Sequence, residues 1–235
     1  MHEAMKMTRN RNSPAAWAVL VALAMCAALV GCVPQQRPVD AIRTSAENRI
    51  RMGDYAGARD DYAEIVAKYP GNWQDQYHLG LCMIETKQYD GARQAMQTAY
   101  TLKPNQEVAD GLAKVMFLQK DESQLFAFLR QRASETKSTA AYLQLGHYAM
   151  ELNDPDSAKV AFDTAIEVDH GRSTEPYLAA AKLEERLGHL DIAIDRLRQA
   201  YGINPYDTRV FEMLRKLGED PNKTKPLPPG REIVK

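Results

Sequence analysis

From residue 40 to residue 217, apolar residues recur at the spacing of an amphipathic helix, in short runs separated by turns. The first predicted helix pair has its internal turn at Gly53 and ends at Pro70. The apolar face of the second helix in this pair is formed by Ala58, Tyr62 and Ile65. Such a short pair cannot bury its apolar faces alone and needs further copies beside it.

The sequence supplies these copies with a period close to 34 residues. Ala58 and Ala92 are 34 residues apart, and Ala158 and Ala193 are 35 apart. The most regular copy runs from Trp73 to Pro104. Its small residues stand where two helices must approach closely, and they are Gly80, Ala92 and Ala99.

Several unlike residue types recur in phase with this period. In a later copy they appear as Tyr142, the pair Leu145-Gly146, and an Ala-x-x-x-Phe spacing from Ala158 to Phe162. On these residues the chain resembles the tetratricopeptide repeat (TPR) family. The resemblance implies an all-α fold, a right-handed α-solenoid of about five TPR helix pairs with a C-terminal capping helix.

Two copies depart from the pattern. The third lacks both the Leu-Gly pair and the alanine of the second helix, and the fourth ends with His170 in place of proline. We interpret the third copy as a degenerate helix pair that maintains the stack. The predicted organisation is a signal peptide (1–31), a lipidated tether (32–39), TPR-like repeat 1 (40–72), repeats 2 (73–106), degenerate 3 (107–138), 4 (139–172) and 5 (173–207), a capping helix (208–217) and a tail (218–235).

The tail contains four prolines and no helical pattern, which predicts a disordered segment. Its stretch from Pro226 to Arg231 has the Pro-x-x-Pro-x-Arg order that SH3-type grooves bind in polyproline II conformation. Such ligands belong mainly to eukaryotic signalling, so a solvated tail is the preferred interpretation.

The beginning of the chain is typical of a secreted protein. Lys6, Arg9 and Arg11 precede an uncharged, alanine-rich apolar run over residues 15–30. This run is short for a membrane span, which needs about 20 apolar residues, and it indicates a signal peptide.

The apolar run ends in Leu29-Val30-Gly31-Cys32, which resembles a bacterial lipobox. The resemblance implies that the Cys32 thiol accepts lipid and becomes the mature N-terminus. The alternative is a plain transmembrane anchor with Cys32 buried in it. We therefore expect the protein to be lipid-anchored in the bacterial cell envelope and to face the periplasm. The residue after Cys32 is Val33 and not the aspartate that retains enterobacterial lipoproteins in the inner membrane, which favours the outer membrane.

Charge and cysteine content narrow the function. Removing residues 1–31 takes away three of the 30 basic and one of the 31 acidic residues, which leaves a net charge of −3. A nucleic-acid surface would be distinctly basic, so none is expected. Cys82 remains as a single thiol and cannot form an intramolecular disulfide.

Motifs for catalysis, cofactors or metals are weak. Ser134 and Lys137 have the Ser-x-x-Lys spacing of penicillin-binding enzymes, without the other elements of those enzymes. His78 and Cys82 share a helix face, but no third residue completes a catalytic or metal site. We therefore predict no enzyme activity, no cofactor, no metal and no small-molecule substrate.

Proteins of the TPR family usually bind an extended segment or a helix along the first helices of the repeats. Excluding the packing positions of those helices leaves their exposed positions. Some TPR proteins bind a C-terminal carboxylate through an ordered set of Lys, Asn, Asn, Lys and Arg residues, the carboxylate clamp. This clamp is not expected here, because Glu47 stands at the position of the first asparagine, and His78 and Gln144 do not supply the missing residues. The predicted groove residues are Arg43, Glu47, Tyr77, Leu81, Glu85, Leu143, His147, Glu151, Leu178 and Lys182. Alternatively, Tyr77 and Leu81 pack mainly against the next helix.

The sequence thus predicts an envelope lipoprotein that serves as a scaffold or adaptor for an unidentified protein or peptide partner. Its layout resembles that of pilus-assembly pilotins and outer-membrane assembly lipoproteins, which is an analogy of architecture alone. Two alternatives stay open: an envelope enzyme acting on cell wall through Ser134-Lys137 or His78-Cys82, and a structural protein that self-associates.

Overall fold

The computed structural model describes residues 37–230 and 232–233 of the chain. The predicted signal peptide and Cys32 lie outside the described residues. The stacked helices belong to a compact unit that begins at Arg43. None of the helices in the described part is both long and apolar enough to cross a membrane.

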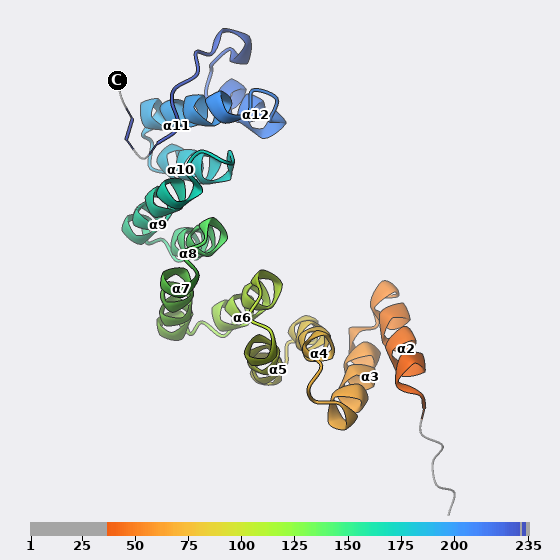
Figure 1. Ribbon diagram of the computed structural model, residues 1–235. Coiled ribbons are helices and arrows are strands. Elements are labelled where there is room, and N and C mark those ends of the chain that lie inside the picture. The colour runs from red at the N-terminus through yellow and green to blue at the C-terminus, as the bar shows by residue number, and fades with distance from the viewer. Residues whose placement is uncertain (1–36, 231, 234–235) are drawn as a thin grey trace, which may run out of the picture. The chain divides into compact units, whose positions relative to one another are not determined.

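The regular elements of the described residues are all helical (Figure 1). They are α2 (Val39–Arg51), α3 (Tyr55–Lys68), α4 (Trp73–Glu85), α5 (Tyr89–Leu102), α6 (Gln106–Leu118), α7 (Glu122–Thr136), α8 (Thr139–Glu151), α9 (Pro155–Asp169), α10 (Glu175–Arg186), α11 (Leu190–Ile203), α12 (Thr208–Lys216) and a single 3-10 turn, η1 (Pro221–Lys223).

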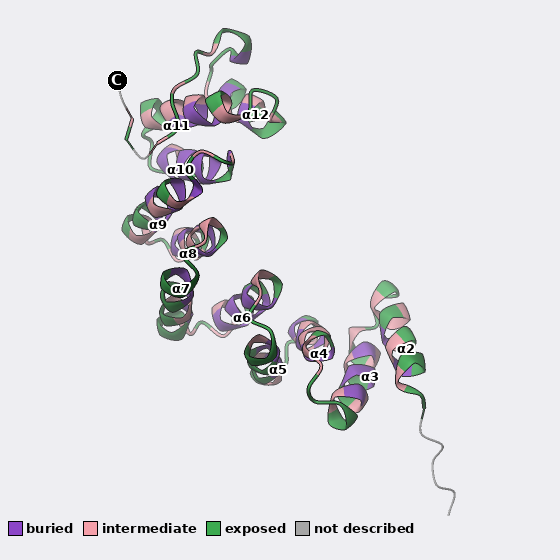
Figure 2. Cartoon of the chain, viewed as in Figure 1, coloured by how far each residue is buried: buried purple, intermediate pink, exposed green. Residues whose placement is uncertain are grey.

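Consecutive helices pack as pairs, and the pairs stack on one another. Within the pairs, α4 packs on α5, α8 on α9 and α10 on α11. The first helices of neighbouring pairs also touch, α4 with α6, α6 with α8 and α8 with α10. Buried residues occur along the stacked helices (Figure 2). This stack of helix pairs is an all-α solenoid, so the predicted fold class is confirmed.

Small residues allow the close approaches within the pairs. A Cβ atom on Gly80 would lie 2.9 Å from Cε of Met96, which reaches across from α5. Ala92 and Ala99 of the same pair are fully buried. The interpretation of these positions as helix contacts therefore holds in the structure.

Each first helix of a pair ends in the same way. The amide two residues beyond the helical cap donates to the carbonyl five positions earlier, as in Asp54 N to Arg49 O (2.9 Å) and Gln88 N to Met83 O (2.8 Å). This is the Schellman motif, which needs a left-handed residue just before the donor. The residues in that conformation are Gly53, Lys87, Lys120, Asn153, Gly188 and, after α12, Gly218.

The second helices end in two different ways. Helices α3, α5 and α11 have 14 residues and are followed, after one residue, by a proline. Helices α7 and α9 have 15 residues and end on left-handed residues, Lys137 with φ 45° and His170 with φ 54°. The missing proline at these two positions thus coincides with one further helical residue.

The third pair is intact despite its poor match to the pattern. Its core residues Leu112, Leu125 and Leu129 are buried in one hydrophobic cluster with Met96 of the preceding pair. Leu112 and Ala113, both fully buried, take the place of the absent Leu-Gly pair, and Gly111 lies against Met96 of the preceding pair. The stack therefore continues through residues 107–138.

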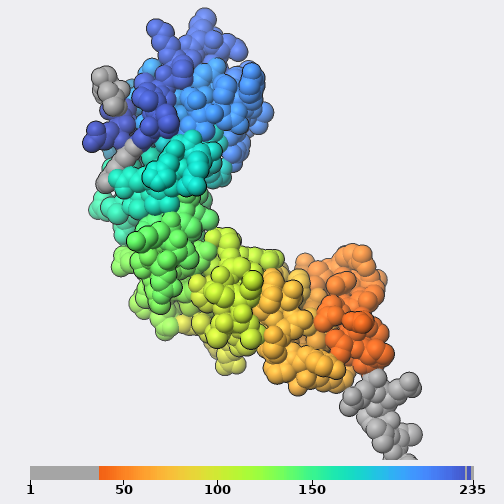
Figure 3. Space-filling view, in the orientation of Figure 1, coloured from red at the N-terminus to blue at the C-terminus, as the bar shows by residue number. Residues whose placement is uncertain are grey.

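The tail differs from the disordered segment predicted by its composition. Residues 225–230 lie against α11, and Figure 3 shows the dark-blue C-terminal atoms resting on the lighter blue of the last helices. Polar groups of α11 bind the backbone carbonyls of the tail, for example Arg198 Nε to Lys225 O at 2.9 Å. A proline-rich segment retains its backbone carbonyls as hydrogen-bond acceptors. Its composition alone does not show that α11 has donors placed to bind them.

Candidate functional site

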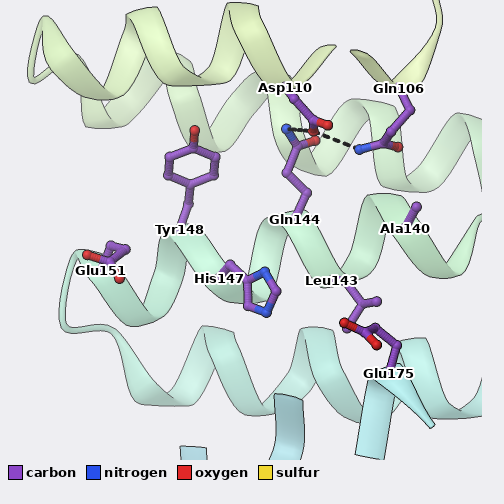
Figure 4. Close-up of a pocket in the computed structure, with 9 residues that line it drawn as sticks. All are labelled: Gln106, Asp110, Ala140, Leu143, Gln144, His147, Tyr148, Glu151 and Glu175. Carbon is purple, nitrogen blue, oxygen red and sulfur yellow. Dashed lines mark hydrogen bonds between the residues drawn. The ribbon is translucent and has the colours of Figure 1, made fainter. Parts of the chain in front are cut away.

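A pocket of about 480 Å³ lies along the first helices α6, α8 and α10 (Figure 4). We call it the acidic pocket. It is lined by Gln106, Asp110, Ala140, Leu143, Gln144, His147, Tyr148, Glu151 and Glu175.

Helical spacing places these side chains on one surface. Gln106 and Asp110 are four residues apart on α6, and Gln144 and Tyr148 are four apart on α8, so each pair shares a helix face. Both helices have a side-chain cap at the N-terminus. The cap of α6 is Asn105, whose side chain accepts from Val108 N at 2.9 Å.

A hydrogen-bond network fixes the floor of the acidic pocket. Asp110 Oδ1 accepts from Gln106 Nε2 and from Gln144 Nε2, both at 2.7 Å (Figure 4). Arg132 reaches in from α7, where it is buried, and donates to Gln144 Oε1 at 3.0 Å and to Gln106 Oε1 at 2.5 Å. The carboxylate of Asp110 is thereby held in one orientation by three helices.

Carboxylates dominate the charge of this pocket. Asp110, Glu151 and Glu175 line it, and its lining contains neither lysine nor arginine. Glu175 pairs with Arg209 at 2.6 Å, whereas no ion pair of Asp110 or Glu151 occurs among the described residues. Burial raises the pKa of Asp110, and the Gln106 hydrogen bond and nearby Arg132 oppose that rise. The pocket lining is therefore acidic, with Arg132 beneath Asp110 and Arg209 beside Glu175 offsetting part of the negative charge.

The two aromatic residues of the pocket are uncharged near neutral pH. Burial lowers the pKa of His147, as does the nearby Lys182. The imidazole ring contacts Phe162 edge-on, with 5.4 Å between ring centroids. Burial raises the pKa of Tyr148 to about 12, so its phenol stays protonated. Together with Leu143 they give the pocket an apolar wall.

A second pocket of about 220 Å³ continues along α8, α10 and α12. His147 belongs to both pockets, and Leu178 and Lys182 line only the second. The structure thus brings the predicted residues Leu143, His147, Glu151, Leu178 and Lys182 into one continuous surface.

The predicted residues from the first half of the chain lie elsewhere. Arg43 is engaged by Asp75 through two hydrogen bonds, at 3.0 and 3.1 Å, and Glu47 is exposed. Glu85 is 3.9 Å from Lys114 Nζ. None of these three lines the acidic pocket or the second pocket.

Tyr77 and Leu81 are half-buried and pack on the hydrophobic cluster formed by α4 to α7. Burial raises the pKa of Tyr77, and Glu107 on the next helix adds to the rise. Tyr77 also approaches Gly111, since a Cβ there would lie 3.2 Å from its ring. This geometry favours the alternative in which both side chains pack against the next helix.

The sequence interpretation missed the contribution of α6. Because the third repeat matched poorly, its first-helix face was not included in the groove. The same fourfold spacing that selected Leu143 and His147 would have selected Gln106 and Asp110. Nothing in the sequence could have placed Arg132 beneath them, because it belongs to a second helix.

The weak catalytic motifs have structural roles. Ser134 Oγ donates to Gln131 O of its own helix at 2.7 Å, and Lys137 ends that helix. His78 stacks on Tyr62 with 5.3 Å between centroids. Cys82 is buried, which raises its thiol pKa to about 11. Within the described residues, no group of three His, Cys, Asp or Glu side chains could hold a metal ion.

Comparison with known proteins agrees with this architecture. Two profiles of the tetratricopeptide repeat match the chain, one over residues 44–107 and the other over residues 139–170. The chain therefore contains tetratricopeptide repeats, and such repeats imply a protein–protein interaction scaffold. No curated protein matches the sequence significantly.

Solved structures with the same fold include proteins from several bacteria. A thermophilic TPR protein of Thermus thermophilus has 16% identity and a TM-score of 0.51, covering 77% of this chain and 98% of its own. A TPR protein of Parabacteroides merdae has 17% identity and a TM-score of 0.56, with 76% and 72% covered. PilF of Pseudomonas aeruginosa has 14% identity and a TM-score of 0.53, with 77% and 82% covered. At such identities the likeness concerns the fold alone.

Proposed function

We propose that this protein is a membrane-anchored scaffold of the bacterial cell envelope that holds a partner protein through the acidic pocket. The observation that carries the proposal is the set of carboxylates along α6, α8 and α10, of which Asp110 and Glu151 form no direct ion pair among the described residues. A scaffold surface of this kind binds by complementary charge and shape.

The partner segment carries a lysine or an arginine. Two unit charges 4 Å apart attract by about 4 kcal/mol at an effective dielectric constant near 20, so a cation gains most where carboxylates lack partners. The aliphatic stem of such a side chain can lie along Leu143 and the ring of Tyr148, which form the apolar wall. Lys182 in the second pocket then faces an acidic or polar position further along the segment.

The anchoring half of the proposal rests on the leader and on Cys32. One acyl chain binds a membrane only marginally, at about 0.8 kcal/mol per buried methylene, whereas two or three chains anchor a protein stably. A lipid on Cys32 would keep the repeats at the membrane surface, and residues 33–39 would act as a short spacer.

The partner class is tested by peptide selection on the purified chain. Random peptides displayed on phage should be enriched in lysine or arginine, and the selected peptides should bind the Glu151→Gln variant more weakly. The control is Glu122→Gln, which removes an exposed carboxylate of α7 that does not line the pocket. Enrichment of acidic peptides, or equal loss of binding in both variants, would contradict the assignment.

The anchor is tested separately. The Cys32→Ala variant should incorporate no labelled palmitate and should be released from membranes, while the repeats stay helical by circular dichroism. Incorporation of label into that variant would show that Cys32 is not the lipidated residue. Affinity purification from detergent-solubilised envelopes, with and without Glu151→Gln, would then identify the partner.

A further inference from the structure

The C-terminal tail is bound as an extended ligand on the second-helix side of the last repeat. We define the tail segment as residues 225–230. At its start, Arg198 Nε donates to Lys225 O at 2.9 Å, and Leu227 N donates to Arg198 O at 3.1 Å. These two bonds fix the direction and register of the tail segment on α11.

Two buried side chains of α11 bind the carbonyls further along. Gln199, 1% exposed, directs Nε2 to Pro228 O at 3.2 Å, Gly230 O at 3.1 Å and Glu232 O at 3.2 Å. Arg196, 4% exposed, donates to Gly230 O at 3.2 Å. The other end of the Arg196 guanidinium pairs with Asp163 of α9 at 3.0 Å, which fixes its position.

Glycines and a buried hydroxyl complete the surface, which we call the tail cleft. A Cβ on Gly202 would lie 2.7 Å from Leu227 O, and one on Gly171 would lie 2.9 Å from Pro229. The Tyr177 hydroxyl is buried and has no hydrogen-bond partner among the described residues. Burial raises the pKa of this hydroxyl, and the neighbouring amide of Gly230 opposes the rise.

The contacts of the tail cleft match the chemistry of a proline-rich chain. Nearly all of them are made to carbonyl oxygens, which proline retains, and Leu227 supplies the one amide donor to α11 among the described residues. An extended segment of this kind loses little conformational entropy on binding because proline already restricts it.

The tail segment is also loosely attached. Its three prolines are not buried, so its docking removes little apolar surface from water. Each hydrogen bond contributes a net of only about 0.5–1.5 kcal/mol. The connection from α12 contains the left-handed Gly218 and the single turn η1. Release of the tail segment therefore needs only local opening, with the helix pairs left intact.

We propose that the tail cleft is a binding site for an extended proline-containing segment, and that two copies of this chain associate by exchanging their tails through it. The second copy is the occupant because it carries the same segment with the same register of carbonyls. Anchoring to one membrane would favour the exchange by raising the local concentration of the copies. This site is separate from the acidic pocket and does not rest on the function proposed for it.

The test uses two full-chain variants with complementary defects and different affinity tags. Gly202→Ala blocks the tail cleft but keeps the tail, and alanine suits the helix at that position. Leu227→Pro removes the amide donor and frees the tail cleft. Lys225→Pro is the matched control, because the Lys225 amide makes no hydrogen bond among the described residues.

Among the combinations of these two variants, only the mixture of Gly202→Ala with Leu227→Pro should form a complex, since the tail of the first fits the cleft of the second. The wild-type chain carrying the two tags should also pair. Two differently tagged samples of the same variant should not form a complex. The chain that carries both Gly202→Ala and Leu227→Pro should not form a complex with Gly202→Ala either. Absence of a complex in the mixture would overturn tail exchange. Circular dichroism and thermal unfolding check that all variants fold.

A synthetic peptide of residues 222–233 tests the tail cleft itself. It should bind Leu227→Pro more tightly than the Lys225→Pro control, in which the chain's own tail competes. The peptide should bind the chain with both Gly202→Ala and Leu227→Pro about tenfold or more weakly than it binds Leu227→Pro. Peptide binding without pairing of chains would overturn the exchange and leave the tail cleft to the chain's own tail, and failure of the peptide to bind would refute the site.

Discussion

Gly146 on α8 lies directly against the ring of Phe162 on α9. A Cβ atom at position 146 would be 2.4 Å from Cε1 and 2.6 Å from Cδ1 of that ring. Phe162 is almost completely buried, so its ring has no room to move away. The glycine therefore sets the distance between the two helices of the fourth repeat.

Gly146→Ala should destabilise the protein. Overpacking of a core costs about 1–3 kcal/mol, and alanine recovers up to about 1 kcal/mol in helix propensity. The matched variant is Gly80→Ala at the equivalent position, where the neighbour is the unbranched, flexible side chain of Met96. Thermal unfolding followed by circular dichroism should show the larger loss for Gly146→Ala. An equal loss in both variants would show that the rigidity of the phenyl ring is not the cause.

Cys82 should be unreactive in the folded protein. Burial raises its thiol pKa to about 11, so the reactive thiolate is scarce near neutral pH, and its side chain is only 1% exposed. Alkylation by iodoacetamide, followed by mass spectrometry, should be slow in buffer and rapid in denaturant. Fast modification of the native chain would restore the nucleophile hypothesis for His78 and Cys82.

Binding of a basic peptide to the acidic pocket should weaken as the solution is acidified from neutral pH. Burial raises the pKa of Asp110, so this carboxylate loses its charge earlier than an exposed one. His147 has a lowered pKa and stays neutral until lower pH, where its protonation adds positive charge. Fluorescence anisotropy at fixed ionic strength measures the affinity. Asp110→Asn should weaken binding at neutral pH and flatten the pH dependence.

Acid should destabilise the start of α12. Hydrogen bonds from Arg209 lower the pKa of Asp207 to about 2, and Thr174 Oγ1 donates to the same carboxylate at 2.5 Å. Because the folded pKa lies below the unfolded value, the stabilisation is present above about pH 4 and is lost as the pH falls toward 2. Asp207→Ala also removes the N-cap and should cost about 1 kcal/mol at neutral pH. The unfolding temperatures of the wild-type chain and Asp207→Ala should converge as the pH approaches the folded pKa of Asp207. A difference that stays constant with pH would contradict this.

The fold was predictable from sequence because it repeats. Most copies contain the same turn and the same small residues, so a departure in one copy is compensated by the other copies. Gly53, Gly188 and the prolines at 70, 104 and 205 mark helix ends in three different pairs. In this way even the degenerate third pair could be placed by its neighbours.

The candidate site was predictable only in part. Leu143, His147, Leu178 and Lys182 follow from helical spacing, and the structure places them together. Tyr77 and Leu81 have the same spacing but pack toward α6, where Gly111 leaves room for the Tyr77 ring. Such an outcome depends on contacts between repeats, which spacing within one helix does not describe.

The tail shows a second limit of sequence interpretation. Its prolines correctly exclude an α-helix, yet the docking depends on Arg196 and Gln199 of α11, which look like ordinary surface residues in the sequence. Both are buried in the structure, with the carbonyls of the tail segment bound to them.

The recurring Schellman turns open a route to engineering a sturdier protein. Three of them hold Lys87, Lys120 or Asn153 in the left-handed conformation with φ 59°, which is strained for a residue with a side chain and unstrained for glycine. Glycine at these three positions would remove the strain, because Gly53 and Gly188 already occupy the same position in the equivalent turns. The heat tolerance of the array could thus be raised turn by turn while the acidic pocket and the tail cleft keep their native residues.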